Sequence, residues 1–288
     1  MGARANPSAY YPGEIDLAVR LDLDGERLGQ ALSGMLASAE AHGGIEKIVE
    51  ALNLKTELFA DAFADGAKDL TPENFLKLLM FMPTVRRRVG GYLEGANFLH
   101  MKQAIGELLA EGDTDERIAR FTAAFPASKR HRWVRDLACE ILHNSRRELY
   151  PLMTRWVWDH KANSGVLREI WFADDVDNML IDAADNYATF LKLREELAGY
   201  LTDNGVFRDV PCYVDLVCAQ VYAGYIASQG GAFLKADFAS EQDSFLFVLR
   251  LLGLDGVQAK AADASAREED DAIDLSDIMT TSRLMGNA

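Results

Sequence analysis

The chain has 288 residues, of which 49% are hydrophobic and 26% are charged. This composition is typical of a folded globular protein and excludes intrinsic disorder of the whole chain. The formal net charge is −15 at pH 7. A charge of this sign opposes bulk binding of nucleic acid or anionic lipid, because the molecule repels both at long range. Any anion-binding site must therefore be local.

Cysteine usage and the apolar segments predict a cytoplasmic protein. The three cysteines, Cys139, Cys212 and Cys218, are too few for a disulfide framework, and their spacing does not fit a zinc hairpin. We expect reduced and mostly buried thiols. The first residues lack the apolar core of a signal peptide, and the longest apolar runs, such as residues 78–82, are far shorter than the roughly 20 residues of a membrane span. We therefore expect no contact with a membrane.

Residues 1–25 form a distinct N-terminal arm. Side chains alternate between apolar and polar over residues 17–23, up to the turn signal Asp24-Gly25. The alternation predicts either a short strand or an extended arm that lies across a helical body. The rest of the sequence has no second alternating run that could pair with a strand.

Residues 26–256 carry helical periodicity and predict a single all-α domain of roughly ten helices. The first helix is expected to end at Gly43-Gly44, and Thr71-Pro72 is a helix start with an N-cap and a proline in the first turn. Shorter helices are predicted over 45–52 and 54–63. Further helices are expected at about 95–111, 114–125, 128–144, 147–160, 166–172, 186–201, 211–229 and 240–252.

The last segment, residues 257–288, changes character. It holds seven acidic residues against three basic ones, a net charge of −4, and it has no aromatic residue. We predict a disordered acidic tail. Four aliphatic residues punctuate the acids and are candidate anchors on a partner: Ile273, Leu275, Ile278 and Met279. The alternative is a solubilising tail in which these aliphatic residues are incidental.

A histidine-rich stretch suggests a metal site as one alternative. Four of the five histidines lie between residues 100 and 160, and Glu140 and His143 have the Glu-x-x-His spacing of helical di-iron proteins. With Glu94 and His100 they could hold iron in a helical oxidase or oxygenase that resembles the heme-oxygenase-like or ferritin-like di-iron enzymes.

The helical wheel argues against this metal site. Glu140 and His143 lie opposite the apolar stripe of their helix, in one row with Asp136 and Arg147. A second Glu-x-x-His pair is missing from the sequence. We therefore expect a solvated face of ion pairs, and neither a metal nor another cofactor.

Basic residues concentrate in the middle of the chain. Residues 84–161 hold 14 Lys and Arg against 10 Asp and Glu, a net charge of +4. The candidate binding residues in two acid-free runs and beside them are Arg86, Arg87, Arg88, Lys129, Arg130, Arg132, Trp133 and Arg135. They favour docking of an acidic protein partner or of an acidic part of the same chain. An alternative is a nucleotide or single-stranded nucleic acid, with arginine on phosphate and Trp133 stacked on a base.

The helix predicted at 211–229 is apolar nearly all round, yet it contains Asp215. A carboxylate in such a helix must be paired, or its pKa rises. Asp215 is therefore a weak candidate for a catalytic residue. The alternative is a structural aspartate that pairs with a helix N-terminus or with an arginine.

Taken together, these features predict a non-enzymatic accessory, assembly or regulatory protein that binds a protein partner through its basic middle and acidic tail. The alternatives are the di-iron enzyme and the nucleotide or nucleic-acid binder.

Overall fold

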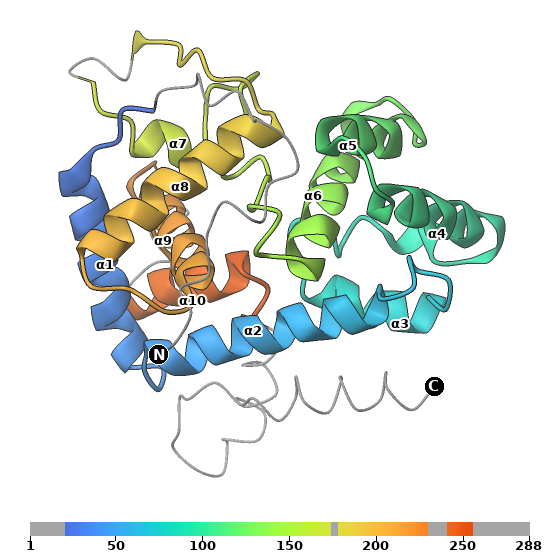
Figure 1. Cartoon of the computed structure of the whole chain (residues 1–288), viewed down its shortest axis with the longest axis horizontal. Coiled ribbons are helices and arrows are strands. Elements are labelled where there is room, and N and C mark those ends of the chain that lie inside the picture. Colours follow the sequence, from blue (N-terminus) through green and yellow to red (C-terminus); the bar gives the residue numbers. More distant parts are fainter. Residues whose placement is uncertain (1–20, 174–177, 230–240, 256–288) are drawn as a thin grey trace, which may run out of the picture.

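The computed structural model describes residues 21–173, 178–229 and 241–255, and every structural statement below refers to these residues. They form an all-α fold with ten α-helices and no strand, as the sequence predicts (Figure 1). The helices are α1 Gly25–Glu40, α2 Ile45–Ala62, α3 Pro72–Met80, α4 Gly95–Leu109, α5 Thr114–Ala123, α6 Trp133–Ser145, α7 Val166–Glu169, α8 Tyr187–Asp203, α9 Val210–Gln229 and α10 Glu241–Leu251. The predicted tail and its four aliphatic anchors lie outside the described residues.

Side-chain caps fix the starts of several helices. Asp24 accepts hydrogen bonds from the backbone N–H groups of the first turn of α1, and Asp113 and Asn186 cap α5 and α8 in the same way. Thr71 caps α3, and Pro72 occupies its first turn as predicted. Each cap satisfies backbone donors that have no partner inside the helix.

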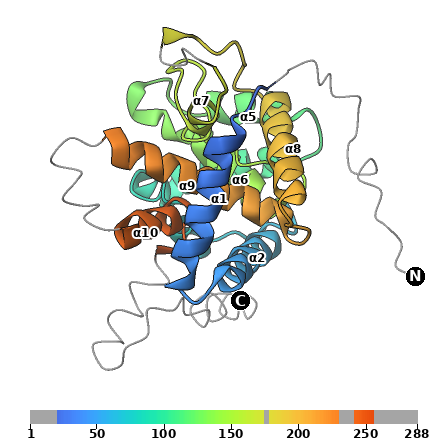
Figure 2. The ribbon, with the colours of Figure 1, turned by 90° about the vertical axis from the view of Figure 1, so that its left-hand side faces the viewer.

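The helices are arranged in two groups that α2 joins. Helices α1, α7, α8 and α10 pack around α9, and the end view shows α1, α8 and α10 on different sides of it (Figure 2). Helices α4 and α5 pack against α6 in the second group, and α2 runs along both groups and contacts both α6 and α9 (Figure 1). Helix α6 also contacts α9 directly, because His143 of α6 lies 3.1 Å from Asp215 of α9.

Helix α9 is the one described helix that is long and apolar enough to cross a membrane by length and composition. The uninterrupted apolar runs of the sequence are too short to predict such a helix. The mean hydropathy of Val210–Ser228 is high enough even though polar residues interrupt the apolar ones. Core helices meet the same criterion, and α9 packs against α1, α7, α8 and α10 and carries the buried Asp215.

The N-terminal arm is extended at its described end and pairs with the segment after α7. Leu23 and Trp171 form an antiparallel bridge. Asp24 N–H donates to Ile170 O at 2.8 Å, and Phe172 N–H donates to Asp22 O at 2.8 Å. Residues 1–20, which hold most of the predicted alternation, lie outside the described residues.

One predicted helix boundary and one predicted helix are wrong. Residues 45–52 and 54–63 form the single helix α2, because no glycine or proline interrupts them. Residues 147–160 are not helical. Pro151 has no N–H to give to a helix, and side chains of other segments take the backbone groups: Arg155 N–H donates to Asp136 Oδ1 at 3.2 Å, and Arg135 donates to Met153 O at 2.9 Å.

Candidate functional site

The polar face of α6 is buried, which overturns the solvated face expected from the helical wheel. Asp136, Glu140, His143 and the following Arg147 are each only 3–4% exposed. The wheel shows correctly that this face is polar, but other segments cover it and supply partners. Arg155 pairs with Asp136, and Asp215 of α9 lies against His143 and Arg147. We call the group formed by Lys55, Glu140, His143, Arg147 and Asp215 the buried polar cluster.

Asp215 of α9 is paired on two sides. Arg147 Nε lies 3.1 Å from its Oδ2 atom, and His143 Nε2 lies 3.1 Å from the same oxygen. Burial would raise the pKa of Asp215, but the attraction and hydrogen bond of His143 and the charge of Arg147 outweigh burial and lower it. The aspartate is therefore ionised at neutral pH and bonded to an arginine, as the structural alternative predicts.

His143 links two acceptors. Its Nδ1 atom lies 2.9 Å from Tyr150 O, and because a carbonyl oxygen can only accept, Nδ1 carries a proton. Its Nε2 atom faces the Asp215 carboxylate at 3.1 Å and lies 3.5 Å from Arg147 Nε. His143, Arg147 and Asp215 thus contact one another in the interior of the protein.

Lys55 and Glu140 form the other half of the cluster. Lys55 Nζ donates to Leu252 O at 2.8 Å, and burial, only partly offset by Glu140, lowers its pKa to about 8. Glu140 accepts hydrogen bonds from Thr84 Oγ1 at 2.9 Å and Asn144 Nδ2 at 3.1 Å. Burial raises the pKa of Glu140 in spite of Lys55 and these hydrogen bonds.

A chain of hydrogen bonds runs from this cluster toward the surface. Arg147 Nη1 donates to Cys212 Sγ at 3.1 Å, the Cys212 thiol donates to Asn53 Oδ1 at 3.2 Å, and Asn53 Nδ2 donates to Asp209 Oδ1 at 3.0 Å. Burial raises the pKa of Cys212 to about 11, so its thiol is protonated at neutral pH. This chain of hydrogen bonds fixes the positions of the side chains and presents no activated nucleophile.

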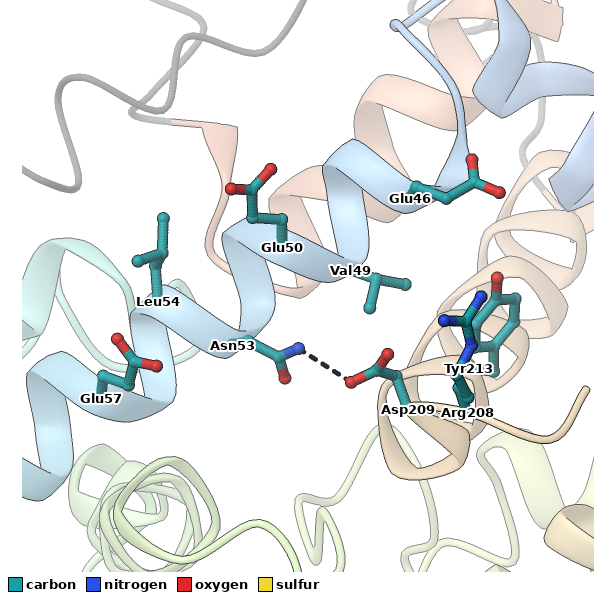
Figure 3. Close-up of a pocket in the computed structure, with 9 residues that line it drawn as sticks. All are labelled: Glu46, Val49, Glu50, Asn53, Leu54, Glu57, Arg208, Asp209 and Tyr213. Atoms are coloured by element: carbon teal, nitrogen blue, oxygen red, sulfur yellow. Dashed lines mark hydrogen bonds between the residues drawn. The ribbon is translucent and has the colours of Figure 1, made fainter.

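Asn53 and Asp209, at the outer end of these hydrogen bonds, line a pocket of about 450 Å³ between α2 and the start of α9 (Figure 3). Three glutamates of α2 line one wall, and Arg208, Asp209 and Tyr213 line the other; the full lining is Glu46, Val49, Glu50, Asn53, Leu54, Glu57, Arg208, Asp209 and Tyr213. Burial and the nearby Glu46 and Asp209 raise the pKa of Tyr213. The lining is acidic, and it includes neither histidine nor cysteine, so it offers hydrogen-bond acceptors rather than a nucleophile with a base.

The proposed iron ligands do not converge. Glu140 and His143 belong to the buried polar cluster, whereas His100 Nε2 lies 2.8 Å from Ala124 O beside α5, and Glu94 is exposed before α4. Within the ranges that the structure describes, no three His, Cys, Asp or Glu side chains form a group that could hold a metal ion.

The structure separates the predicted basic set into paired and exposed residues. Arg86 binds both carboxylate oxygens of Asp255 at 2.9 and 2.6 Å, and Arg132 binds Asp159 at 3.2 Å. Arg135 donates to Met153 O and Asp185 O. Trp133 is 4% exposed, and its ring contacts Tyr92 and His131, so it is not placed to stack on a base.

The remaining cations lie on two loops that touch each other. Tyr92 OH and His131 Nε2 are 3.0 Å apart, and the Tyr92 ring also packs on Phe125 and Trp133. These contacts join residues 84–92 to residues 126–132. We call the exposed cations of the two loops the basic loop surface: Arg87, Arg88, Lys129 and Arg130. In the described part of the chain none of the four forms an ion pair with a carboxylate.

Sequence reasoning missed Lys55, Cys212 and Asn53 as parts of the site. Lys55 had a readable signal, since it interrupts the apolar stripe of α2 between Leu52 and Phe59, where a charge needs a buried partner.

Comparison with protein-family models, with curated proteins and with solved structures gives no match.

Proposed function

We propose that this protein is a non-enzymatic accessory or regulatory factor that binds an acidic segment of another protein at its basic loop surface. One observation carries the proposal: the Tyr92–His131 contact joins two loops whose sequences contain no acidic residue and which expose Arg87, Arg88, Lys129 and Arg130. The chain as a whole has a net charge of −15, so these cations form a local exception to its long-range repulsion.

A protein partner fits this surface better than a nucleic acid does. Single-stranded nucleic acids bind through stacking on exposed aromatic rings, and the aromatic residues of this region, Tyr92, Phe125 and Trp133, pack on one another. Repulsion between the acidic body and a long phosphate backbone would grow with the length of nucleic acid, whereas a short acidic peptide meets the basic loops alone. Steering by these cations would raise the association rate of such a peptide.

The test is affinity capture with the full chain and charge-reversed variants in a lysate of the organism's own cells. R87E/R88E and K129E/R130E each reverse two cations of the surface. K68E/K161E is the matched control, because it makes the same change in net charge at two exposed lysines outside both loops. We expect a protein with an acidic segment to be retained by the unchanged chain and the control, and to be lost from both surface variants and at high ionic strength.

Two outcomes would contradict the proposal. Equal retention of the same proteins by all variants would show that the basic loop surface is not the binding site. Salt-dependent binding of a short polyuridine oligonucleotide by the unchanged chain and the control, with loss in the surface variants, would instead identify a nucleic-acid site.

A further inference from the structure

The described chain ends at a rigidly held point beside the basic loop surface. Arg86 binds the Asp255 carboxylate through two hydrogen bonds, and Lys55 holds Leu252 O at 2.8 Å. Gly253 has a φ of +75° and lies so close to the Phe81 backbone that a Cβ atom would overlap it. These three contacts fix the position of Asp255, where the described chain ends.

An exposed apolar stripe on α3 begins beside Asp255. Arg86 Nη1 also donates to Met80 O at 3.1 Å, which places the end of α3 beside the Arg86–Asp255 pair. Met80 is 49% exposed and Leu76, one helical turn before it, is 48% exposed. Arg87 and Arg88 follow directly in sequence and are exposed. Apolar and cationic groups therefore lie together next to the place where the tail starts.

The tail has the complementary chemistry within reach. It carries seven acids and three bases; Ile273, Leu275 and Ile278 are each next to an aspartate, and Met279 follows Ile278. Ile273 is the eighteenth residue after Asp255, and an extended chain spans up to about 3.3 Å per residue, or about 60 Å. The nine residues of α3 cover only about 13 Å. Tethering also gives the tail a high effective concentration at this surface.

We infer that residues 257–288 dock in cis on the adjoining apolar and cationic groups of α3 and the basic loop surface. The aliphatic residues of the tail contact Leu76 and Met80, and its acids contact Arg87 and Arg88. Where the basic loop surface binds an acidic partner, as proposed above, the docked tail competes with that partner and regulates access to it. The docking itself does not depend on that function. A second copy of the chain could offer the same tail in trans, which the test separates.

The docking test uses the full chain with a nitroxide attached through S276C, in the tail. The native thiols at 139, 212 and 218 are buried, so the label goes to position 276. Methyl labelling of methionine then reports proximity: the Met80 resonance should broaden, whereas that of Met35, which is fully buried in α1, should not. R87E/R88E should restore the Met80 resonance, and the matched K68E/K161E variant should leave it broadened.

Three results would overturn the inference. These are a Met80 resonance that is not broadened, equal broadening in R87E/R88E, and broadening that arises only between a spin-labelled chain and a separate methyl-labelled chain. The last result would assign the contact to a second copy.

Competition is read separately, so the two proposals fail in different ways. E268Q/E269Q/D270N/D271N removes four acids of the tail, and we expect several-fold more acidic partner to be captured by this variant than by the unchanged chain. Broadening at Met80 with no partner captured by any variant would leave tail docking standing and refute the proposed function. Partner capture that is lost in R87E/R88E, without broadening of the Met80 resonance, would support the proposed function and refute tail docking.

Discussion

Replacing Asp215 by asparagine tests whether the buried polar cluster holds α6 and α9 together. The substitution keeps the shape of the side chain but removes its charge, and it leaves Arg147, whose side chain is only 5% exposed, without the carboxylate that its Nε atom contacts at 3.1 Å. Removing one partner of a buried ion pair costs about 3–5 kcal/mol, because the other charge stays buried and uncompensated. The amide oxygen can still accept one hydrogen bond, so we expect about 3 kcal/mol.

The measurement is urea unfolding of the full chain, supported by thermal unfolding. For a protein of this size, about 3 kcal/mol corresponds to a fall in Tm of about 6–12 °C. The control is D61N, because Asp61 is exposed on α2 and its replacement should change the free energy of unfolding by less than about 0.5 kcal/mol. A D215N variant within about 1 kcal/mol of the unchanged chain would refute the pairing.

The effect of D215N should also depend on pH. The pKa of Asp215 is lowered from its ordinary value of 3.8 in the folded protein, so the ionised carboxylate stabilises the fold above that pH. This contribution is lost as the pH falls through the folded pKa, and the difference between D215N and the unchanged chain should shrink there. In a double-mutant cycle with R147M, the double variant should lose less stability than the sum of the single variants. Additive losses, or a difference that does not vary with pH, would contradict the ion pair.

Three further predictions follow from the same packing. Burial raises the pKa of Glu140 from its ordinary 4.5, so its protonated form stabilises the fold at low pH and that contribution is lost as the pH rises. Relative to E140Q, the unchanged chain should therefore lose stability in urea unfolding as the pH rises above 4.5. G253A should lower the free energy of unfolding by about 3 kcal/mol or more in the same assay, because Gly253 has a positive φ and contacts the Phe81 backbone. The control G199A lies on an open face of α8 and should stabilise the fold by about 0.8 kcal/mol. A G253A variant as stable as the unchanged chain would contradict the tight contact. Burial raises the pKa of Cys139 to about 12, so none of the three thiols should react with Ellman's reagent before urea unfolds the chain.

Local sequence signals predict the start of a helix better than they predict what covers it. Thr71-Pro72 acts within one turn and begins a helix where expected, and Asp24, which we read as a turn signal, caps α1 in the same way. The burial of Glu140 and His143 depends instead on Lys55 and Asp215, which lie 85 and 72 residues away along the chain. A helical wheel contains no information about such distant partners, so a polar face buried against other polar groups reads as a solvated face.

The segment 147–160 shows the opposite limit, since its apolar residues are buried without helical structure. Tyr150, Met153 and Trp158 are 7%, 1% and 0% exposed. Their spacing resembles a helical stripe, but Trp158 Nε1 donates to Ala183 O at 2.8 Å, and Asp136 binds the Arg155 backbone and side chain. Burial alone therefore does not select a helix; the segment keeps an irregular backbone in which Asp136 and Arg135 bond the backbone groups of Arg155 and Met153.

The arginines of the basic middle illustrate why a charge count does not identify a binding surface. The sequence places Arg86 and Arg87 side by side, yet the first pairs with Asp255 from the other end of the chain, and the second is exposed. An arginine held in a bidentate pair gives little attraction to a ligand, because its carboxylate cancels its field at short range. The net charge of +4 over residues 84–161 counts both arginines alike. The electrostatic field at the surface depends on which carboxylates the fold brings to each cation. These tertiary contacts are absent from a count of charges along the sequence.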